Sequence, residues 1–313
     1  MLLAAAVVVN HLTVLPLGLS AVLLFFVLSG YWVADLWART TGPDRLATFF
    51  LGRALRIWPV YLAVMATSAL FHQRLPSLNE IALLGAASHG AAPLIGTEWS
   101  LDIELQFYAL LPLLVLTATR LNRATIIVLT LATAWLGVWI EHRFGLVTVM
   151  KFLPAFAIGM AISHFRWQPS RRVALGSLVA FAAWVVASAL LWENQPATMA
   201  NVFGPWDDHA IAALWVAPLL PYVAASVAAP SRPADRRIGD LSYPLYLVHL
   251  PVIALIEQFW DWRTLSGFAG ALTTIALATA LLWMMVDRPA EAFRKRLLAG
   301  RPFARRYPAV AAR

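Results

Sequence analysis

Residues 17–37 read LGLSAVLLFFVLSGYWVADLW, a mostly apolar run that is long enough to cross a bilayer as one helix. A spanning α-helix needs about 20 such residues. Similar runs lie near 56–72, 105–119, 124–141, 148–165, 171–192, 210–229, 241–258 and 265–286, and residues 1–12 resemble the end of one more span. The sequence therefore predicts an all-α, polytopic membrane bundle of about ten transmembrane helices with short connections. The 105–119 run is short, so its helix is expected to start earlier.

The composition also points to a membrane. Hydrophobic residues make up 61% of the chain and charged residues 13%, with a mean hydropathy of +0.71. An average soluble domain is about 45–50% apolar and about 25% charged. The chain has no cysteine, which excludes disulfides, thiolate nucleophiles and zinc–thiolate sites.

The distribution of basic residues predicts the orientation, because cytoplasmic loops retain Arg and Lys. If the first span begins inside, nearly all of the 24 basic residues fall in inner connections or in the tail. The exceptions are Arg74, Arg143, Lys151 and Arg263. Both termini are therefore expected on the cytoplasmic side of an inner (plasma) membrane. A membrane domain over 1–290 is expected to precede a basic cytoplasmic tail over 291–313. The net charge of +8 then reflects topology and contact with the lipid bilayer, and indicates no nucleic acid.

Ionisable side chains inside spans are costly, which makes each a functional candidate. His11 ends the first apolar run and can take a proton from a hydroxyl near neutral pH. The alternative is an interfacial histidine at a helix end. Arg53 and Arg56 share one helix face and can grip phosphate oxygens bidentately. The alternative for this pair is simple anchoring at the inner face.

Two further polar groups lie at the start of apolar helices. Three carboxylates, Glu98, Asp102 and Glu104, precede Tyr108, which shares a helix face with Glu104. Helix N-terminal acids favoured by the helix dipole are the alternative, and this suits Glu98 and Asp102 better than Glu104. In the next-to-last apolar run, the residues of one stripe are Ser242, Tyr246 and His249. Such a stripe can also serve only to hold helices together.

Weaker candidates are His164, at an inner helix end, and Asp287, which is expected to pair with a nearby arginine. The histidines of the outer connections are expected to be solvated; they are His72, His89, His142 and His209. No two histidines have the spacing of metal ligands, so no metal is expected.

Taken together, these segments resemble acyltransferase family 3, the bacterial integral-membrane O-acyltransferases. The matching pieces are His11, Phe25-Phe-Val-Leu-Ser29-Gly30, Arg53-Ala-Leu-Arg56-Ile-Trp-Pro-Val-Tyr61, Trp99-Ser100-Leu-Asp102-Ile-Glu104-Leu-Gln-Phe-Tyr108 and Ser242-Tyr243-Pro-Leu-Tyr246-Leu-Val-His249. Their order and spacing agree over roughly 1–290.

The resemblance implies that acetyl-CoA, or another acyl-CoA, is the donor at the cytoplasmic face. The implied acceptor is a sugar hydroxyl on a surface glycan, peptidoglycan, a lipid-linked sugar or a glycosylated small molecule. The resemblance also implies that His11 is catalytic, and we expect Glu104, Tyr108 and His249 to assist it. The expected cofactor-binding residues are Arg53, Arg56, Ser29 and Tyr61. The expected acceptor-binding residues are Glu98, Trp99, Ser100, Asp102, Ser242, Tyr243 and Tyr246.

One departure from the family pattern concerns an arginine that relatives carry upstream of the matching histidine. Here that position would precede Met1, which, with the short first helix, indicates a true start further upstream. If Met1 is the start, an inactive scaffolding relative becomes an alternative. The other alternative is a membrane transporter or flippase, because intramembrane charges also suit a transport pathway.

Overall fold

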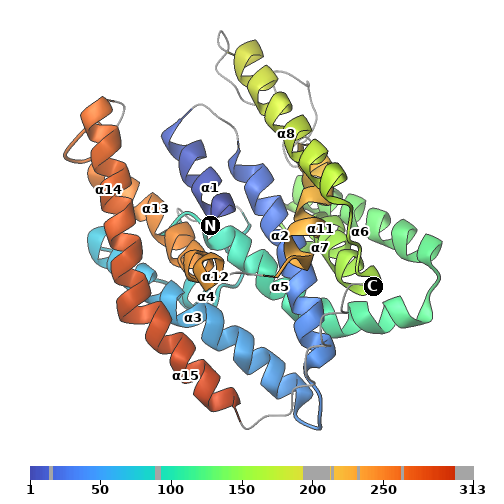
Figure 1. Cartoon of the computed structure of the whole chain (residues 1–313). Helices are drawn as coiled ribbons and strands as arrows, with labels where there is room; N and C mark the ends of the chain where they lie inside the picture. Colours follow the sequence, from blue (N-terminus) through green and yellow to red (C-terminus); the bar gives the residue numbers. More distant parts are fainter. Residues whose placement is uncertain are drawn as a thin grey trace.

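The computed structural model describes residues 1–13, 17–88, 93–192, 212, 215–230, 233–261 and 264–299, with 188–192 described by backbone alone. All long regular elements in these ranges are helices (Figure 1). The α-helices are α1 (Leu2–Leu12), α2 (Gly18–Arg39), α3 (Arg45–Phe71), α4 (Leu78–Ala82), α5 (Glu98–Arg120), α6 (Arg123–Phe144), α7 (Val149–Phe165), α8 (Arg171–Trp192), α11 (Leu220–Ala228), α12 (Pro233–Asp240), α13 (Ser242–Ile256), α14 (Leu265–Leu282) and α15 (Arg288–Leu298). A 3₁₀ turn, η1 (Ala217–Leu219), precedes α11, and a π turn, η2 (Trp283–Asp287), joins α14 to α15.

The structure confirms the expected all-helical, apolar architecture. Six helical stretches among the described residues are long and apolar enough to cross a membrane. They are Gly18–Arg39, Arg45–Phe71, Glu98–Arg120, Arg123–Phe144, Pro233–Ile256 and Leu265–Leu298. Shorter apolar helices are Leu2–Leu12, Val149–Phe165 and Ala217–Ala228. The total of ten spans and the cytoplasmic placement of both termini remain predictions.

Several helices are longer than the apolar runs that predict them. The helix α3 begins at Arg45, well before the run at 56–72, and α5 begins at Glu98. The first turns of both helices carry polar residues, which apolar runs do not include. At the other end, α14, η2 and α15 form one continuous rod (Figure 1), so the start of the predicted tail is helical. The rest of that tail, 300–313, lies outside the described residues, as does the whole of 193–209, a predicted outer connection.

Close backbone contact between α2 and α7 forms the centre of the bundle. A Cβ on Gly159 would lie 1.9 Å from the carbonyl oxygen of Val27, and one on Gly30 would lie 2.2 Å from that of Phe156. Only glycine fits at either position, and small residues at such crossings are common between membrane helices. Beside them, the ring of Phe156 stacks on Phe26 and Phe107, with centroids 4.8 Å and 4.1 Å apart.

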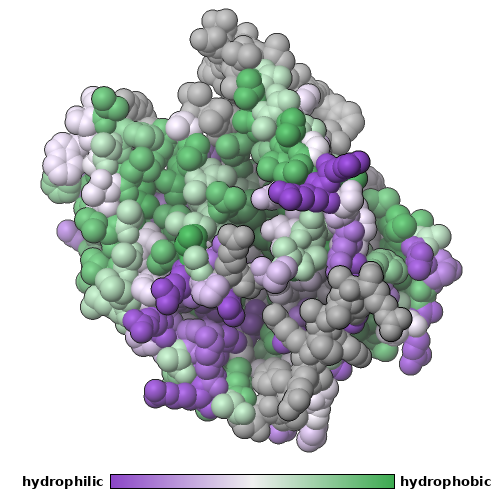
Figure 2. Space-filling view, viewed as in Figure 1, coloured by the Kyte–Doolittle hydropathy of each residue, from purple (hydrophilic) through white to green (hydrophobic). Residues whose placement is uncertain are grey.

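The surface separates into apolar and polar regions. Figure 2 shows hydrophobic residues over α13 and α14 and a hydrophilic region over α12 and α15. On α6, Trp135 and Ile127 are largely exposed. A helix with large apolar side chains on its open face is expected to contact lipid.

Candidate functional site

A pair of histidines meets where α1 packs against α13. His249 lies in the middle of α13 and is fully buried, whereas His11, in the last turn of α1, is exposed. Their ring centroids lie 5.3 Å apart, with the ring planes at 40°. The amide N–H of Gly18 donates to Oδ1 of Asn10 at 3.0 Å, which ties the end of α1 to the start of α2. This contact fixes the turn that carries His11.

The hydrogen bonds of His249 define its tautomer. Its Nδ1 lies 2.8 Å from the carbonyl oxygen of Tyr246 and 3.3 Å from that of Leu245. A carbonyl oxygen only accepts, so Nδ1 must carry the proton and Nε2 keeps its lone pair when the ring is neutral. This Nε2 atom is buried without a hydrogen-bond partner among the described residues. The ring is therefore a buried acceptor beside the exposed ring of His11.

A second polar cluster gathers around Glu104 on α5. Its Oε1 accepts hydrogen bonds from the hydroxyl of Ser29 at 2.7 Å and from that of Tyr108 at 2.5 Å. The guanidinium of Arg53 lies 5.8 Å from the centroid of the Tyr108 ring. Side chains of α2 and α5 thus meet at one carboxylate, with Arg53 of α3 beside the Tyr108 ring, and the predicted shared face of Glu104 and Tyr108 is confirmed.

The second arginine of the pair is held by the opposite end of the chain. Nη1 of Arg56 lies 2.9 Å from Oδ1 of Asp287. The guanidinium also lies 5.4 Å from the ring centroid of Tyr243, whose hydroxyl donates to the carbonyl of Ile57 at 2.9 Å. The predicted pairing of Asp287 with an arginine is therefore confirmed. The sequence did not indicate which arginine it pairs with.

Tyr246 connects the histidine pair to α5. Its hydroxyl shares a 2.6 Å hydrogen bond with the hydroxyl of Ser100, and its ring lies 6.0 Å from that of His249. Ser242, one turn earlier, has a buried hydroxyl oxygen with no partner within the described part of the chain. The predicted stripe on α13 therefore faces the interior.

The acidic residues at the start of α5 hold neighbouring backbone in place. Oε1 of Glu98 accepts from the amide of Ile95 at 2.6 Å, and Oδ2 of Asp102 accepts from that of Ala87 at 2.9 Å. Trp99 packs against the aromatic rings of Phe26 and Phe152. These contacts match the alternative of helix N-terminal acids for Glu98, while its other oxygen, Oε2, is buried and unpaired among the described residues.

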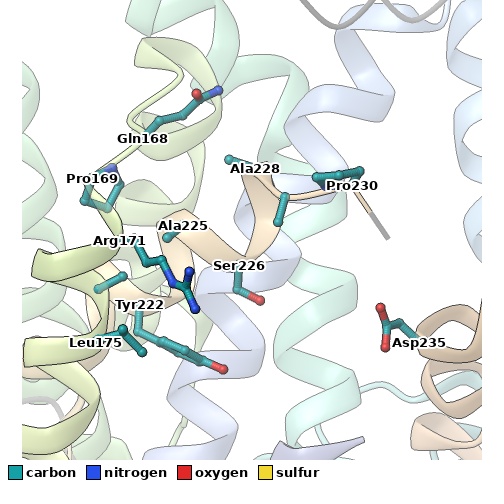
Figure 3. Close-up of a pocket in the computed structure, with 12 residues that line it drawn as sticks. Gln168, Pro169, Arg171, Leu175, Tyr222, Ala225, Ser226, Ala228, Pro230 and Asp235 are labelled. Carbon is teal, nitrogen blue, oxygen red and sulfur yellow. The ribbon is translucent and has the colours of Figure 1, made fainter. Parts of the chain in front are cut away.

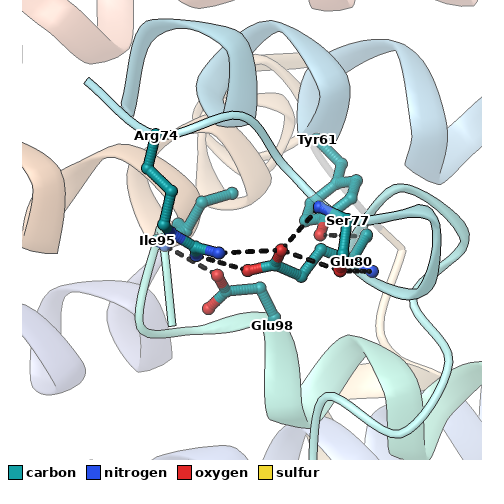
Figure 4. Close-up of polar contacts among 6 residues, drawn as sticks. All are labelled: Tyr61, Arg74, Ser77, Glu80, Ile95 and Glu98. Atoms are coloured by element: carbon teal, nitrogen blue, oxygen red, sulfur yellow. Dashed lines mark hydrogen bonds and ion pairs between the residues drawn. The ribbon is translucent and has the colours of Figure 1, made fainter. Parts of the chain in front are cut away.

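Tyr61 contacts a different region from Arg53 and Arg56. Its hydroxyl donates to the carbonyl of Glu80 at 2.6 Å (Figure 4). Arg74 forms an ion pair with the Glu80 carboxylate at 2.5 Å, and Ser77 caps α4 by bonding reciprocally with Glu80. The Arg74 guanidinium holds the pKa of the Glu80 carboxyl below its ordinary value. The structure therefore places Tyr61 beside the connection between α3 and α5.

A cavity of about 650 Å³ lies apart from these residues, between α8 and α11 (Figure 3). Its polar lining includes Arg171, Tyr222, Ser226 and Asp235. No residue predicted for catalysis, donor binding or acceptor binding lines it. The predicted residues lie instead on the packed helices α1, α2, α3, α5 and α13.

Sequence reasoning did not identify Asn10 as the residue that fixes the turn carrying His11. It precedes His11 directly, but nothing in the spacing indicates a partner across the turn. His89 and His209 lie outside the described residues. His164 lies in the last turn of α7, and its ring contacts that of Phe165.

Comparison with known proteins identifies the class of protein to which this membrane bundle belongs. A family model described as an acyltransferase domain matches residues 2–285. The protein is thus a membrane acyltransferase, and the chain belongs to acyltransferase family 3. It is similar to Nodulation protein 10 of Rhizobium leguminosarum bv. viciae, with 30% identity over 324 aligned positions that cover 90% of this chain and 84% of that protein. No solved structure matches the chain.

Proposed function

We propose that the protein transfers an acyl group, typically acetyl, from acyl-CoA at the cytoplasmic face to a hydroxyl of a sugar or glycosylated acceptor. The observation that carries this proposal is the position of the His11 ring, 5.3 Å from the ring of His249, whose Nε2 is buried without a partner among the described residues, in a chain of this family. An exposed imidazole is reachable by substrates, and the buried ring beside it can influence its protonation.

In direct transfer, His11 acts as general base. It takes the proton of the acceptor hydroxyl while the oxygen attacks the thioester carbonyl, and it returns the proton to the sulfur of the departing CoA. In the relay alternative, the His11 nitrogen attacks the thioester first, releases CoA and then passes the acyl group to the hydroxyl. Positioning supplies much of the rate in either case, because a thioester is already activated.

His249 is proposed to orient His11. Because Nδ1 of His249 is occupied by the Tyr246 carbonyl, only Nε2 remains to accept a hydrogen bond from a neighbouring N–H or hydroxyl. The hydrogen bond between the hydroxyls of Ser100 and Tyr246 supports the turn of α13 that carries this ring. Glu104 and Tyr108 are proposed to complete the polar centre next to the two histidines.

The donor is proposed to bind at the Arg53–Arg56 end of α3. Guanidinium groups suit phosphate oxygens because they offer paired N–H donors. Ser29 is proposed to lie along the path of the acyl-CoA arm. Tyr61 lies on the same helix, but it is fully buried and its hydroxyl donates to the Glu80 carbonyl, so it is proposed to support the donor site without contacting the donor.

The acceptor is proposed to approach from the opposite side, past the start of α5 and the stripe on α13. The residues proposed for the acceptor are Glu98, Trp99, Ser100, Asp102, Ser242, Tyr243 and Tyr246, of which Tyr243 lies next to Arg56 at the donor end. Glu98 and Ser242 both present buried oxygen atoms without a partner in the described ranges, and a sugar hydroxyl can satisfy such atoms.

A labelling experiment tests the function directly. Membranes containing the protein receive acetyl-CoA labelled in the acetyl group, and surface glycans and glycosylated small molecules are then analysed by mass spectrometry. We expect an acetyl-sized mass increment that disappears in a knockout strain. Identical acylation in knockout and wild-type cells would overturn the proposal.

A further inference from the structure

The junction between α14 and α15 departs from regular helix geometry at one place. Residues Trp283–Asp287 form a π turn inside an otherwise continuous helix. An added residue rotates the following helix face by about 100° relative to a regular α-helix. Such turns occur often at functional sites. Here the turn ends at Asp287, the residue that contacts α3.

Asp287 is buried where it meets Arg56. Its side chain is 5% exposed, whereas that of Arg56 is 29% exposed. A carboxylate buried in an apolar bundle is costly unless it is paired, so the ion pair with Arg56 offsets the cost of burying Asp287. Further along, Leu298 of α15 packs over Gly52 of α3. This contact holds α15 against the helix that carries Arg53 and Arg56.

The contact leaves Arg56 able to bind a second anion. Only Nη1 contacts Asp287, and a guanidinium has five N–H donors. The rest of the group lies near the face of the Tyr243 ring and is partly exposed. The hydroxyl of Tyr243 is in turn tied to α3 through the Ile57 carbonyl. Arg56 is thus held on its buried side and open on its other side.

We propose that Asp287 is a positioning residue for the donor site: it holds the Arg56 guanidinium so that its remaining N–H groups face a phosphate of acyl-CoA. This inference rests on the proposed function of Arg56 in donor binding. Asp287 does not touch the donor; it acts through Arg56, and it lies at the end of the π turn, where its carboxylate reaches α3.

The test uses the full-length protein in membranes and measures kcat and KM for acetyl-CoA separately. Asp287→Asn removes the charge at nearly constant shape. We expect KM to rise roughly ten- to a hundredfold through misplacement of Arg56, with a smaller change in kcat. Asp287→Glu keeps the charge and should recover part of the loss; if the Asn variant fails to fold, the KM of the Glu variant against wild type is the readout.

Two further variants separate the possible outcomes. Arg56→Gln should raise KM as well, and adding Asp287→Asn to it should cause little further increase, because both act through one contact. Glu141→Gln is the matched control, since Glu141 forms another largely buried ion pair, with Lys151 on α7 at 2.6 Å. It should lower thermal stability without changing KM.

The results distinguish this inference from the function on which it rests. If Arg56→Gln raises KM and Asp287→Asn does not, the positioning role is overturned while donor binding by Arg56 stands. An unchanged KM in Arg56→Gln would instead refute the donor role of Arg56, and the positioning role with it. A loss of stability in Asp287→Asn with KM unchanged, as in the Glu141→Gln control, would reduce Asp287 to a structural residue.

Discussion

The ring of His11, exposed at the end of α1, lies 5.3 Å from the ring of His249, which is fully buried in α13. The two residues come from opposite ends of the sequence, and each has a different environment. Burial and the Tyr246 carbonyl fix one ring, while the other remains accessible. In the proposed acyl transfer, the accessible ring meets the substrates and the buried ring orients it.

The variant His249→Asn distinguishes the roles of the two nitrogens of the buried ring. The amide NH₂ of asparagine takes the place of Nδ1 and can still donate to the Tyr246 carbonyl, but nothing replaces Nε2. We therefore expect a folded protein whose kcat falls at least about tenfold, a modest part of what acid–base groups contribute. Acceptor-dependent CoA release in membranes measures it. His72→Asn, at an exposed helix end, is the control and should retain wild-type kcat. Full activity in His249→Asn would remove Nε2 from the mechanism.

Ser29 and Tyr108 donate to the same oxygen of Glu104, which makes their contributions interdependent. Either single variant, Ser29→Ala or Tyr108→Phe, leaves Glu104 one of the two hydroxyl donors, whereas the double variant removes both. Each single change should cost about 1.5–3 kcal/mol, the range for hydrogen bonds to charged groups, and the double change more than the sum. Thermal unfolding in detergent measures the three values. A double variant no less stable than either single variant would contradict the shared-acceptor geometry.

The crossing of α2 and α7 predicts a strong effect of a single methyl group. Gly159→Ala would place a Cβ 1.9 Å from the Val27 carbonyl oxygen, so the helices must separate. We expect a loss of about 1–3 kcal/mol, as for other overpacked sites, seen as a lower unfolding temperature. Gly176→Ala on α8 is the matched control, because nothing described lies within 4 Å of the added atom, and it should not destabilise the protein. Equal unfolding temperatures for the two variants would refute the close crossing.

The ion pair of Arg74 with Glu80 predicts a pH dependence outside the membrane spans. Because the pKa of Glu80 is lowered in the folded protein, its contribution to stability is complete above the pKa of an unfolded glutamate, about 4.3. The contribution decreases as the pH falls through the lower folded value. Glu80→Gln lacks it at every pH. The difference in unfolding temperature between wild type and Glu80→Gln should therefore shrink between pH 6 and pH 3, values chosen to bracket about 4.3. A constant difference would contradict this assignment.

The sequence predicted the helical architecture because apolar run length is a local property. It also predicted that Glu104 and Tyr108 share a helix face, which depends only on helix periodicity, and that Asp287 pairs with an arginine, which depends on the cost of a buried charge. The earlier start of α5 was expected from the short run at 105–119 and is confirmed, whereas the start of α3 at Arg45 was not predicted, because its first turn is polar.

Contacts between distant segments could not be predicted from the residues alone. Spacing within one helix does not indicate that His11 meets His249, that Arg56 rather than Arg53 pairs with Asp287, or that the Tyr61 hydroxyl bonds to Glu80. The π turn at Trp283–Asp287 is likewise a tertiary effect, since its sequence reads as ordinary helix. These features depend on how the helices pack, so they became known only from the structure.

Replacement of His11 tests the proposed chemistry most directly. CoA release from acetyl-CoA is followed in membranes with and without an acceptor-containing glycan fraction, at equal amounts of His11→Ala and wild-type protein. The His72→Ala variant serves as a matched control. Loss of the general base or acyl carrier should lower acceptor-dependent release by at least about a hundredfold in His11→Ala, with His72→Ala unaffected. Release at the wild-type rate from His11→Ala would contradict the proposal that this imidazole carries the transfer.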